Sequence, residues 1–594
     1  MKGVGPMLMP GLTDTEKSTV TTEVFGGYNH NLEIGDGEFF NMKNLTADNY
    51  PLLSQRQKRS FDRQLNSPQA LISRDALCWI DNQQLYISGY SMAEYMKAVQ
   101  ITSGKKQIVS MGAYLCIFPD GIYFNTEKYS DNGYMGHANS VALGASRKLS
   151  ISLCTVDGTA ITVSYTQSNQ PENATNGQYW IDTSGSVHTL KQYAATTSQW
   201  VSVPTVYLKL AADGIGQGFS KYDGIQLSGL TGSEQVKALN GSHILYDVAE
   251  SYIVIVGLVA QTTELTNGTI KTARRVPEMD YVVQSGNRLW GCKYGMVDGK
   301  PVNEIYASKL GDCKNWRCFA GLATDSYAAA RGSDGVFPGA VSYLGNPLFF
   351  KERCMERVYA SGSGAHQIVT TECSGVQKGS AKSLQVVGGV LYYLSDEGVL
   401  AFDGSLPVTV SQALGERRYS AGVGGAWREK YYLSALDEDG AASLLVYDSE
   451  RKLWHREDEL RAEGFACKDG ELYCLTAEGQ LLAMKGAGET HEGPVQWMAE
   501  TGELGLQTPE RKRLTRLLLA MRPEQGTTVA AWVSYDQGAT WQKQGQITGS
   551  GGIREQLVAI RPRQCRAMRL RLTGNGQCAI FAATALYGRG SDRL

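Results

Sequence analysis

The chain has 594 residues, of which 42% are hydrophobic and 20% are charged, and its formal net charge is -2. These values exclude a disordered chain, and they exclude a globally polycationic protein that binds nucleic acid through bulk charge. Such a length exceeds one ordinary hydrophobic core, so we expect several domains or one large repeat fold with appendages. The 67 glycines and 31 tyrosines, without long helical runs of Ala, Glu, Lys and Leu, favour β structure.

No membrane or metal signal is present in the sequence. No stretch reaches the roughly 18 apolar residues needed to cross a bilayer, and residues 1–17 lack the hydrophobic region of a signal peptide, so we expect folding in a cytoplasm. The twelve cysteines are scattered, mostly within apolar runs, and are expected to be reduced core residues. Cys313 and Cys318, the nearest pair, have no second pair or neighbouring histidine, so we predict no metal or cofactor.

Residues 1–60 are expected to form an extended N-terminal segment. Pro51, Arg56 and Arg59 lie near its end, and the first predicted hairpin follows soon afterwards. We expect this segment to close the repeat fold that follows. The alternative is that it clasps a neighbouring subunit.

Seven hairpins recur along the chain, each with two β-branched or aromatic runs joined by a Gly, Asp or Asn turn. From the third hairpin onward they start roughly 40 to 55 residues apart, which is the period of a four-stranded propeller blade. A blade cannot bury both faces of its sheet alone, so the repeats must stack radially. We therefore predict an all-β fold with a β-propeller of about six to eight blades, formed by residues 61–145 and 279–494. The hairpins are 76–90, 112–129, 287–316, 345–362, 388–405, 429–457 and 468–484.

Residues 146–278 break this period and are predicted to form a β domain inserted into the propeller. They include a stretch rich in Ser, Thr, Asn and Gln, followed by an apolar β run. Tyr179, Trp180 and Trp200 lie in the polar stretch and are candidates for an aromatic platform that binds a sugar. The alternative for these side chains is ordinary core packing.

Residues 495–594 are predicted to form a separate β-sandwich, because long alternating strands are separated by Gly and Pro turns. This part is basic. In "CRAMRLRL" the strand alternation places Arg569 and Arg571 on one face and Arg566 apart from them. That face is either a solvated strand face or a surface for an anionic or protein partner.

The stretch "VSYDQGATWQ" (533–542) matches the Asp box found in sialidases and other sugar-handling β-propellers. In this motif Ser534 and Asp536 fold back onto a hairpin turn, Gly538 supplies a positive φ and Trp541 packs beneath. We interpret it as a brace for a turn and not as a catalytic group. Sialidase propellers repeat the box across their blades, whereas here it occurs once, in the terminal sandwich, so it does not predict a glycosidase.

Sequence signatures of catalysis are missing. There is no nucleophile elbow, phosphate loop or dinucleotide fingerprint, and the seven histidines form no H-x-H or H-E-x-x-H group. A pair of catalytic carboxylates leaves no sequence spacing, because folding assembles it. We predict no catalytic, cofactor-binding or metal-binding residues and expect that the chain is not an enzyme.

The segment 25–59 resembles the start of virion proteins of tailed phages. The phrases that carry this resemblance are Phe25-Gly26-Gly27, Asp36-Gly37-Glu38, Asn44-Leu45, Tyr50-Pro51 and Arg56 with Arg59. The phrases "NRLWGCKYG", "NEIYASKLGDCKNW" and "GNPLFFKE" also resemble propeller blades of that group. Over about residues 25–590, the chain is similar to the tail nozzle, tail-tube and packaged-DNA-stabilisation proteins of short-tailed phages.

This resemblance implies a non-enzymatic virion structural protein, a tail nozzle or head-tail component that forms a ring around the genome exit channel. The ring would typically have six copies and would contact adaptor, portal or tail subunits, and double-stranded DNA would pass through it. The protein would be assembled in the host cytoplasm and located in the virion. One alternative is a glycan-binding or glycan-cleaving β-propeller used in host recognition. Another is a bacterial propeller scaffold unrelated to phage.

Overall fold

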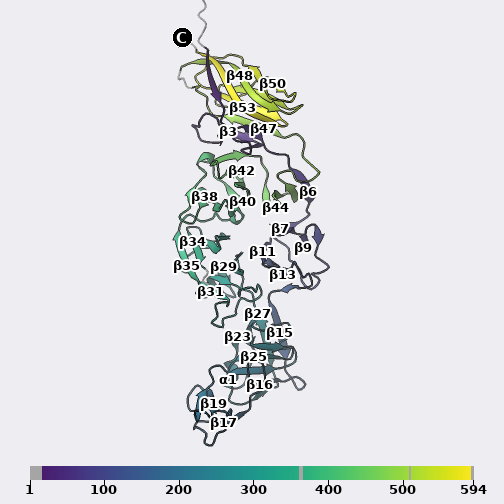
Figure 1. Ribbon diagram of the computed structural model, residues 1–594, viewed down its shortest axis with the longest axis vertical. Coiled ribbons are helices and arrows are strands. Elements are labelled where there is room, and N and C mark those ends of the chain that lie inside the picture. The colour runs from purple at the N-terminus through teal and green to yellow at the C-terminus, as the bar shows by residue number, and fades with distance from the viewer. Residues whose placement is uncertain (1–16, 360–364, 507–509, 590–594) are drawn as a thin grey trace, which may run out of the picture. The chain divides into compact units, whose positions relative to one another are not determined.

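The computed structural model describes residues 17–359, 365–506 and 510–589. The chain forms two compact units: unit 1 contains Met1–Asp81 and Cys373–Leu594, and unit 2 contains Asn82–Glu372. Strands make up nearly all of the regular structure (Figure 1). None of the described residues forms a helix that is both long enough and apolar enough to cross a membrane. The structure confirms the predicted all-β fold, a β-propeller with an inserted β domain and a C-terminal β-sandwich.

Unit 2 contains three propeller blades, each an antiparallel sheet of four strands that pair in chain order. The first blade is β11 (Gln107–Met111), β12 (Tyr114–Phe118), β13 (Ile122–Asn125) and β14 (Asn132–Tyr134). The second is β28 (Tyr281–Ser285), β29 (Arg288–Val297), β30 (Lys300–Ala307) and β31 (Tyr327–Ala330). The third is β32 (Gly339–Tyr343), β33 (Asn346–Phe350), β34 (Cys354–Tyr359) and β35 (Gln367–Glu372).

Strand alternation explains why these blades stack. Val282 and Val283 are neighbours on β28 and therefore point to opposite faces of the sheet. Val282 packs into the cluster that contains Val109 of β11, and Val283 packs into the cluster that contains Phe349 of β33. Both faces of the blade are thus buried between its neighbours. The turn between β28 and β29 uses Gly286 and Asn287 with φ of 58° and 55°, the type I′ geometry that suits a right-twisted hairpin.

The inserted domain packs three sheets around one hydrophobic cluster. The first sheet has the order β15 (His137–Ala142), β27 (Thr269–Arg274), β22 (Gly224–Ser228) and β23 (Gly241–Ile244). The second has the order β24 (Asp247–Ala249), β25 (Tyr252–Val256), β21 (Tyr207–Ala211), β16 (Leu149–Cys154) and β26 (Thr263–Leu265). The third is β17 (Val163–Gln167), β18 (Tyr179–Asp182), β19 (Thr189–Ala194) and β20 (Gln199–Ser202). A one-turn helix, α1 (Glu234–Lys237), begins where the Ser233 side chain accepts a hydrogen bond from the backbone N–H of Val236.

Unit 1 contains three further blades. The first is β36 (Gln385–Val387), β37 (Val390–Ser395), β38 (Gly398–Phe402) and β39 (Val408–Thr409). The second is β40 (Ser420–Trp427), β41 (Lys430–Leu436), β42 (Ala442–Asp448) and β43 (Leu453–Arg456). The third is β44 (Ala462–Lys468), β45 (Glu471–Thr476), β46 (Gln480–Ala483) and β6 (Ser60–Gln64). Four more strands follow β6 along the chain. Unit 1 contains β7 (Pro68–Ser73) and β8 (Leu77–Asp81), and unit 2 contains β9 (Gln84–Ile87) and β10 (Tyr90–Ser91).

The strand β6, which starts at the last residue of the N-terminal segment, pairs antiparallel with β46 and completes the last blade of unit 1. Arg56 and Arg59 hold the segment in place just before β6. The Arg59 guanidinium donates to Glu457 at 2.8 Å and to Asp458 at 2.7 Å, and Arg56 forms an ion pair with Glu492. These arginines are therefore structural ties within the chain.

The N-terminal strands also join this propeller part to the sandwich. The second blade of unit 1 continues from β43 through β2 (Gly27–Tyr28) and β3 (Glu38–Lys43) to β47 (Gln496–Thr501). The sheet ends with β52 (Arg569–Asn575), β49 (Thr528–Ser534) and β50 (Gln542–Thr548). The facing sheet contains β4 (Leu45–Thr46), β5 (Leu53–Gln55), β53 (Cys578–Arg589), β48 (Lys512–Pro523) and β51 (Arg554–Ala559), with β1 (Lys17–Thr22) paired to β53.

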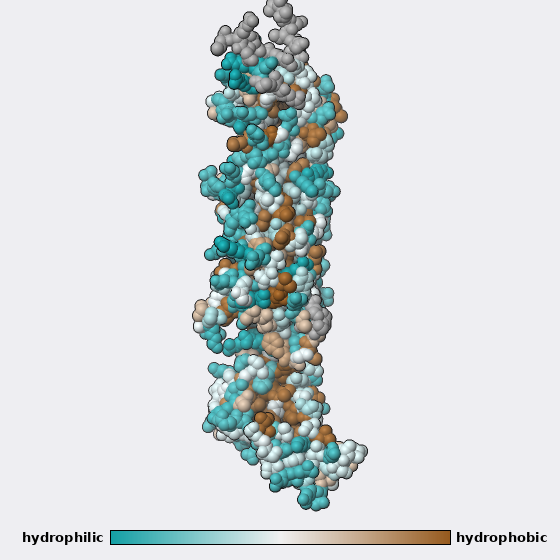
Figure 2. Space-filling model, turned by 90° about the vertical axis from the view of Figure 1, so that its left-hand side faces the viewer, coloured by the Kyte–Doolittle hydropathy of each residue, from teal (hydrophilic) through white to brown (hydrophobic). Residues whose placement is uncertain are grey.

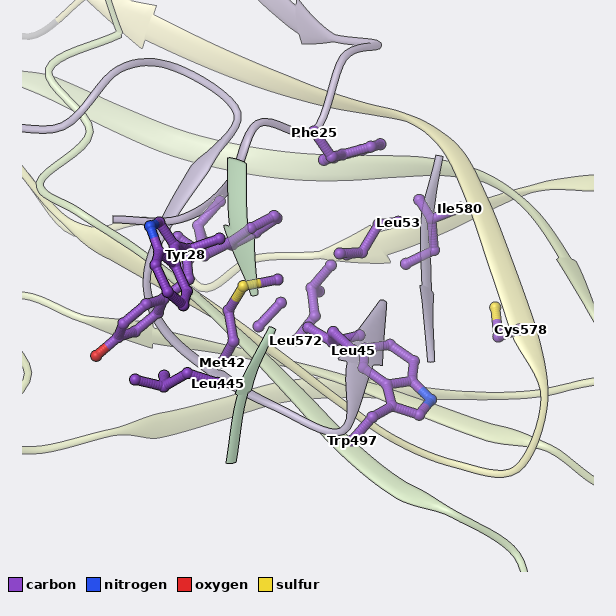
Figure 3. Packing of buried hydrophobic residues seen from close by; sticks show 14 of the residues in the cluster. Phe25, Tyr28, Met42, Leu45, Leu53, Leu445, Trp497, Leu572, Cys578 and Ile580 are labelled. Carbon is purple, nitrogen blue, oxygen red and sulfur yellow. The ribbon is translucent and has the colours of Figure 1, made fainter. Parts of the chain in front are cut away.

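The core of unit 1 lies where the blade, the N-terminal strands and the sandwich meet. Figure 3 shows Tyr28 and Leu45 from the N-terminal segment packed with Leu445 of the blade and with Trp497 and Leu572 of the sandwich. These side chains are almost fully buried, with exposed fractions of 7% or less. One continuous apolar cluster therefore stabilises these parts of unit 1 together.

Candidate functional site

One face of the β17–β20 sheet carries an aromatic cluster. The register places Trp180 opposite Lys191 and next to Tyr165, and it places Tyr193 opposite Trp200. Since paired residues share a face and alternate residues of a strand do too, these side chains point to the same side of the sheet. The opposite side carries Ile181 and Leu190, which are buried in the core of the inserted domain. The aromatic face is the side turned away from that core.

Trp200 lies at the centre of the cluster. Its ring centroid is 6.0 Å from that of Tyr165, 5.5 Å from that of Trp180 and 5.3 Å from that of Tyr193, with steep interplanar angles in each pair. Edge-to-face contacts of this kind fix the orientation of aromatic rings. The cluster is thus a preformed aromatic surface rather than a set of separate side chains.

Backbone carbonyl groups at the end of β17 and in the loop that follows it anchor both indole groups. Trp180 Nε1 donates to the carbonyl oxygen of Gln167 at 2.9 Å, and Trp200 Nε1 donates to that of Pro171 at 3.4 Å. Trp180 is 3% exposed and belongs to the packed layer, whereas Trp200, Tyr165 and Tyr193 are partly exposed. Because the indole N–H groups are already used, the partly exposed rings of Trp200, Tyr165 and Tyr193 offer a ligand apolar surface, and Trp180 supports them from the packed layer.

A charged pair borders the aromatic cluster. Lys191 Nζ donates to Asp182 Oδ2 at 2.8 Å and lies 4.8 Å from the centroid of the Trp180 ring. Hydrogen bonds from Lys191 and Ser184 lower the pKa of Asp182 to about 2, so its carboxylate stays ionised near neutral pH. The site therefore combines apolar ring surfaces with a fixed donor and a fixed acceptor at their edge.

The predicted platform of Tyr179, Trp180 and Trp200 is wrong for Tyr179, which does not lie on the aromatic face. Tyr179 immediately precedes Trp180 on β18, so it points to the other face, where it packs against the core of the inserted domain. The tyrosines that share the aromatic face with Trp180 and Trp200 are Tyr165 and Tyr193. Strand alternation already separates Tyr179 from Trp180, but the partners across the sheet depend on a register that the sequence does not reveal.

The Asp box has the predicted structural role. Asp536 Oδ1 accepts hydrogen bonds from Ser534 Oγ at 2.7 Å and from the Thr540 backbone N–H at 2.9 Å, and Gly538 has a φ of 96°. Hydrogen bonds from Thr540 and Ser534 lower the pKa of Asp536 to about 2. Trp541 packs under the Arg571 guanidinium, which lies 3.9 Å from its ring centroid. The motif braces a hairpin tip.

The arginines on the basic face of β52 have partners within the chain. Arg571 donates to Glu500 at 2.8 Å, and Arg569 lies 3.7 Å from the same carboxylate. The Arg569 guanidinium also stacks on Phe40, 4.5 Å from the ring centroid. Glu500 and two aromatic rings thus pair these arginines within the chain, and the surface for an anionic or protein partner stays a prediction from the sequence.

The described residues contain no group of three or more His, Cys, Asp or Glu side chains that could hold a metal ion. None of the twelve cysteines, all within the described ranges, forms a disulfide, and nine of them are buried.

Comparisons with known proteins add little at the level of sequence: no protein-family model and no curated protein matches the chain. An exo-β-1,3-galactanase from Phanerochaete chrysosporium matches with 9% identity and a TM-score of 0.20, covering 51% of this chain and 94% of that chain. PorZ, a surface component of the type-IX secretion system of Porphyromonas gingivalis, matches with 10% identity and a TM-score of 0.26, covering 87% and 77%. An arabinoxylan arabinofuranohydrolase of glycoside hydrolase family 43 from Bacillus subtilis matches with 10% identity and a TM-score of 0.14, covering 52% and 94%.

These findings correct two predictions. The main interpretation was a non-enzymatic phage virion protein, and the chain was expected not to be an enzyme; the matched structures named here are glycoside hydrolases and a secretion component instead. The values of identity and TM-score assign no activity to this chain. The ring assembly, the phage partners, the passage of DNA and the location in a virion stay predictions from the sequence.

Proposed function

We propose that this protein binds glycans through the aromatic face of the β17–β20 sheet. The observation that carries the proposal is the grouping of Tyr165, Trp180, Tyr193 and Trp200 on the side of the sheet that faces away from the core of its domain. A group of aromatic rings that only completed a core would face Ile181 and Leu190 instead.

The chemistry of this face suits a sugar. A pyranose ring has an apolar face of C–H groups that packs on an aromatic ring, and its hydroxyl groups need hydrogen-bond partners at the edge of the contact. Trp200 and its tyrosine neighbours provide the rings, and Lys191 and Asp182 provide a donor and an acceptor nearby. Sites of this composition, mostly apolar with a few fixed polar groups, are typical of small-ligand recognition.

The position of the sheet agrees with such a role. In Figure 1, β17 and β19 lie at one end of the inserted domain, and in Figure 2 the corresponding end is coloured mostly white and teal. This colouring reflects a tip rich in Ser, Thr, Asn and Gln with few strongly hydrophobic residues. An aromatic surface in a polar tip is available to a polar, hydroxylated ligand without exposing a large hydrophobic patch.

The proposal is tested with a glycan array followed by titration of the best ligand, read from tryptophan fluorescence. Trp200→Ala is expected to weaken binding about tenfold or more, since the central ring of the cluster is lost. Trp532→Ala is the matched control, because Trp532 is a partly exposed tryptophan of the sandwich with its own hydrogen bond to Thr573. Absence of binding to any glycan, or equal binding by the Trp200→Ala protein, would overturn the proposal.

A further inference from the structure

A polar pocket lies within unit 1. It has a volume of about 660 Å³ and is bordered by the blades β40–β43 and β44–β46 and by the N-terminal segment after β4. Its lining includes Trp427 at the end of β40, Lys430 at the start of β41 and Lys485 just after β46. Asp48 from the N-terminal segment completes this side of the pocket.

Asp48 lies between the two lysines. Lys430 Nζ donates a short hydrogen bond to Asp48 Oδ1 and lies 3.9 Å from Asp448 Oδ2, and Lys485 Nζ lies 3.8 Å from Asp48 Oδ2. Burial alone would raise the pKa of Asp48, but Lys485 and Lys430 outweigh this effect and lower it to about 2. Asp48 is therefore an ionised acceptor whose charge is already balanced.

Lys485 retains unused hydrogen-bonding capacity. Its side chain is 8% exposed, and its ammonium group lies 4.3 Å from the Trp427 ring centroid and 5.3 Å from that of Tyr432. Within the part of the chain that the structure describes, its ammonium has no acceptor at hydrogen-bonding distance, Asp48 being the nearest carboxylate. Cation–π contacts stabilise the charge but leave the N–H groups without acceptors.

Two buried polar residues of the blade that carries Lys430 are not among the lining residues of the pocket. Tyr432 and His455 are each 1% exposed, and neither the Tyr432 hydroxyl nor the ring nitrogens of His455 form hydrogen bonds with the described residues. Burial, reinforced by Lys430, holds the pKa of His455 well below its usual range, so the ring is neutral and offers one donor and one acceptor. Because Tyr432 and His455 do not line the pocket, Lys485 is the group that offers a donor to a molecule in it.

The charges of the lining restrict the kind of molecule. Six carboxylate side chains and four cationic side chains line the pocket, so its net charge disfavours a phosphate or another anion. A neutral polyhydroxylated molecule can donate O–H groups to the carboxylates and accept a hydrogen bond from Lys485 at the same time. The volume falls in the range of small-ligand sites and can hold one or two sugar rings.

We propose that this pocket binds a neutral mono- or disaccharide, with Lys485 donating to a sugar hydroxyl and the surrounding carboxylates accepting from others. The site is independent of the aromatic face of the inserted domain, because its lining residues all belong to unit 1. Either site can exist without the other.

The test uses the full-length Trp200→Ala protein, so that the aromatic face does not contribute. Saturation-transfer NMR with glucose, galactose, lactose and maltose is expected to show transfer to at least one of these sugars. Adding Lys485→Met should then weaken that sugar's binding about tenfold or more, whereas Lys43→Met, a surface control paired with Glu459 outside the pocket, should not change it. Arg428→Gln alters an exposed lining residue without disturbing the buried groups, and it should weaken binding several-fold.

Three results would overturn the proposal. The first is the absence of transfer to all four sugars in the Trp200→Ala protein. The second is unchanged binding in both the Lys485→Met and the Arg428→Gln proteins. The third is tighter binding of glucuronate or inorganic phosphate than of the neutral sugars, which would show that the pocket is an anion site.

Discussion

Removal of Arg59 should release the N-terminal strand that completes the last blade of unit 1. Arg59 is 6% exposed and donates to Glu457 and Asp458, and Glu457 itself is only 2% exposed. Leaving a buried carboxylate without its partner costs about 3–5 kcal/mol. Arg56 remains 3.9 Å from Glu457 and 3.6 Å from Asp458, so we expect Arg59→Leu to fall at the lower end, about 3 kcal/mol.

Hydrogen exchange measures this effect locally. A loss of about 3 kcal/mol corresponds to roughly 100-fold faster exchange of the backbone amides in β6 and β46, which pair with each other. Lys43→Ala is the control, because the Lys43–Glu459 pair is 43% and 48% exposed and an exposed pair contributes no more than about 1 kcal/mol. If exchange of β6 in the Arg59→Leu protein matches that of the Lys43→Ala protein, the buried ion pairs do not hold this strand and the reasoning is wrong.

Three further predictions follow from named contacts. Folding lowers the pKa of Asp48 from 3.8 to about 2, so its ionised carboxylate stabilises unit 1 by about 2 kcal/mol above pH 4, and this stabilisation disappears as the pH falls toward 2. In acid unfolding, Asp48→Asn should therefore make the free energy of unfolding depend less on pH between 4 and 2. Asp536→Ala should speed hydrogen exchange in the 534–541 turn while glycan titrations remain unchanged, since the carboxylate braces only that turn. Tyr179→Leu should leave glycan affinity within about twofold of the unmutated protein in the same titration, because Tyr179 faces the core of its domain.

Local sequence signals account for the blades well. The hairpin at 468–484 was predicted from its two apolar runs, and its turn at Asp469 and Gly470 has the positive φ values of 51° and 79° that the residue types favour. The repetition of such hairpins was sufficient to predict a propeller, because each blade needs neighbours on both faces.

Pairing between distant segments could not be predicted in the same way. The β6–β46 pairing joins residues more than four hundred positions apart, and the sheet that runs from β43 through β2 and β3 to β47 has no turn or spacing that specifies its register. Such registers are set by burial in the assembled core, here the cluster around Tyr28 and Trp497. The boundaries of the five domains taken from the sequence stay predictions.

The candidate site also depends on pairings that the sequence does not specify. Trp180 and Trp200 were identified by residue type, but Tyr165 and Tyr193 join them only through cross-strand pairing. The pocket around Lys485 was missed altogether, because Asp48, Lys430 and Lys485 come from three separate segments and no motif connects them. Residue composition shows which chemistry is available, and folding decides which groups meet.

The most direct test of the central claim is a titration of the intact protein with the glycan that it binds best on an array. We predict saturable binding that Trp200→Ala weakens about tenfold or more and that Trp532→Ala leaves unchanged. Equal affinities for all three proteins, or no binding to any glycan, would contradict the assignment of the aromatic face as a glycan site.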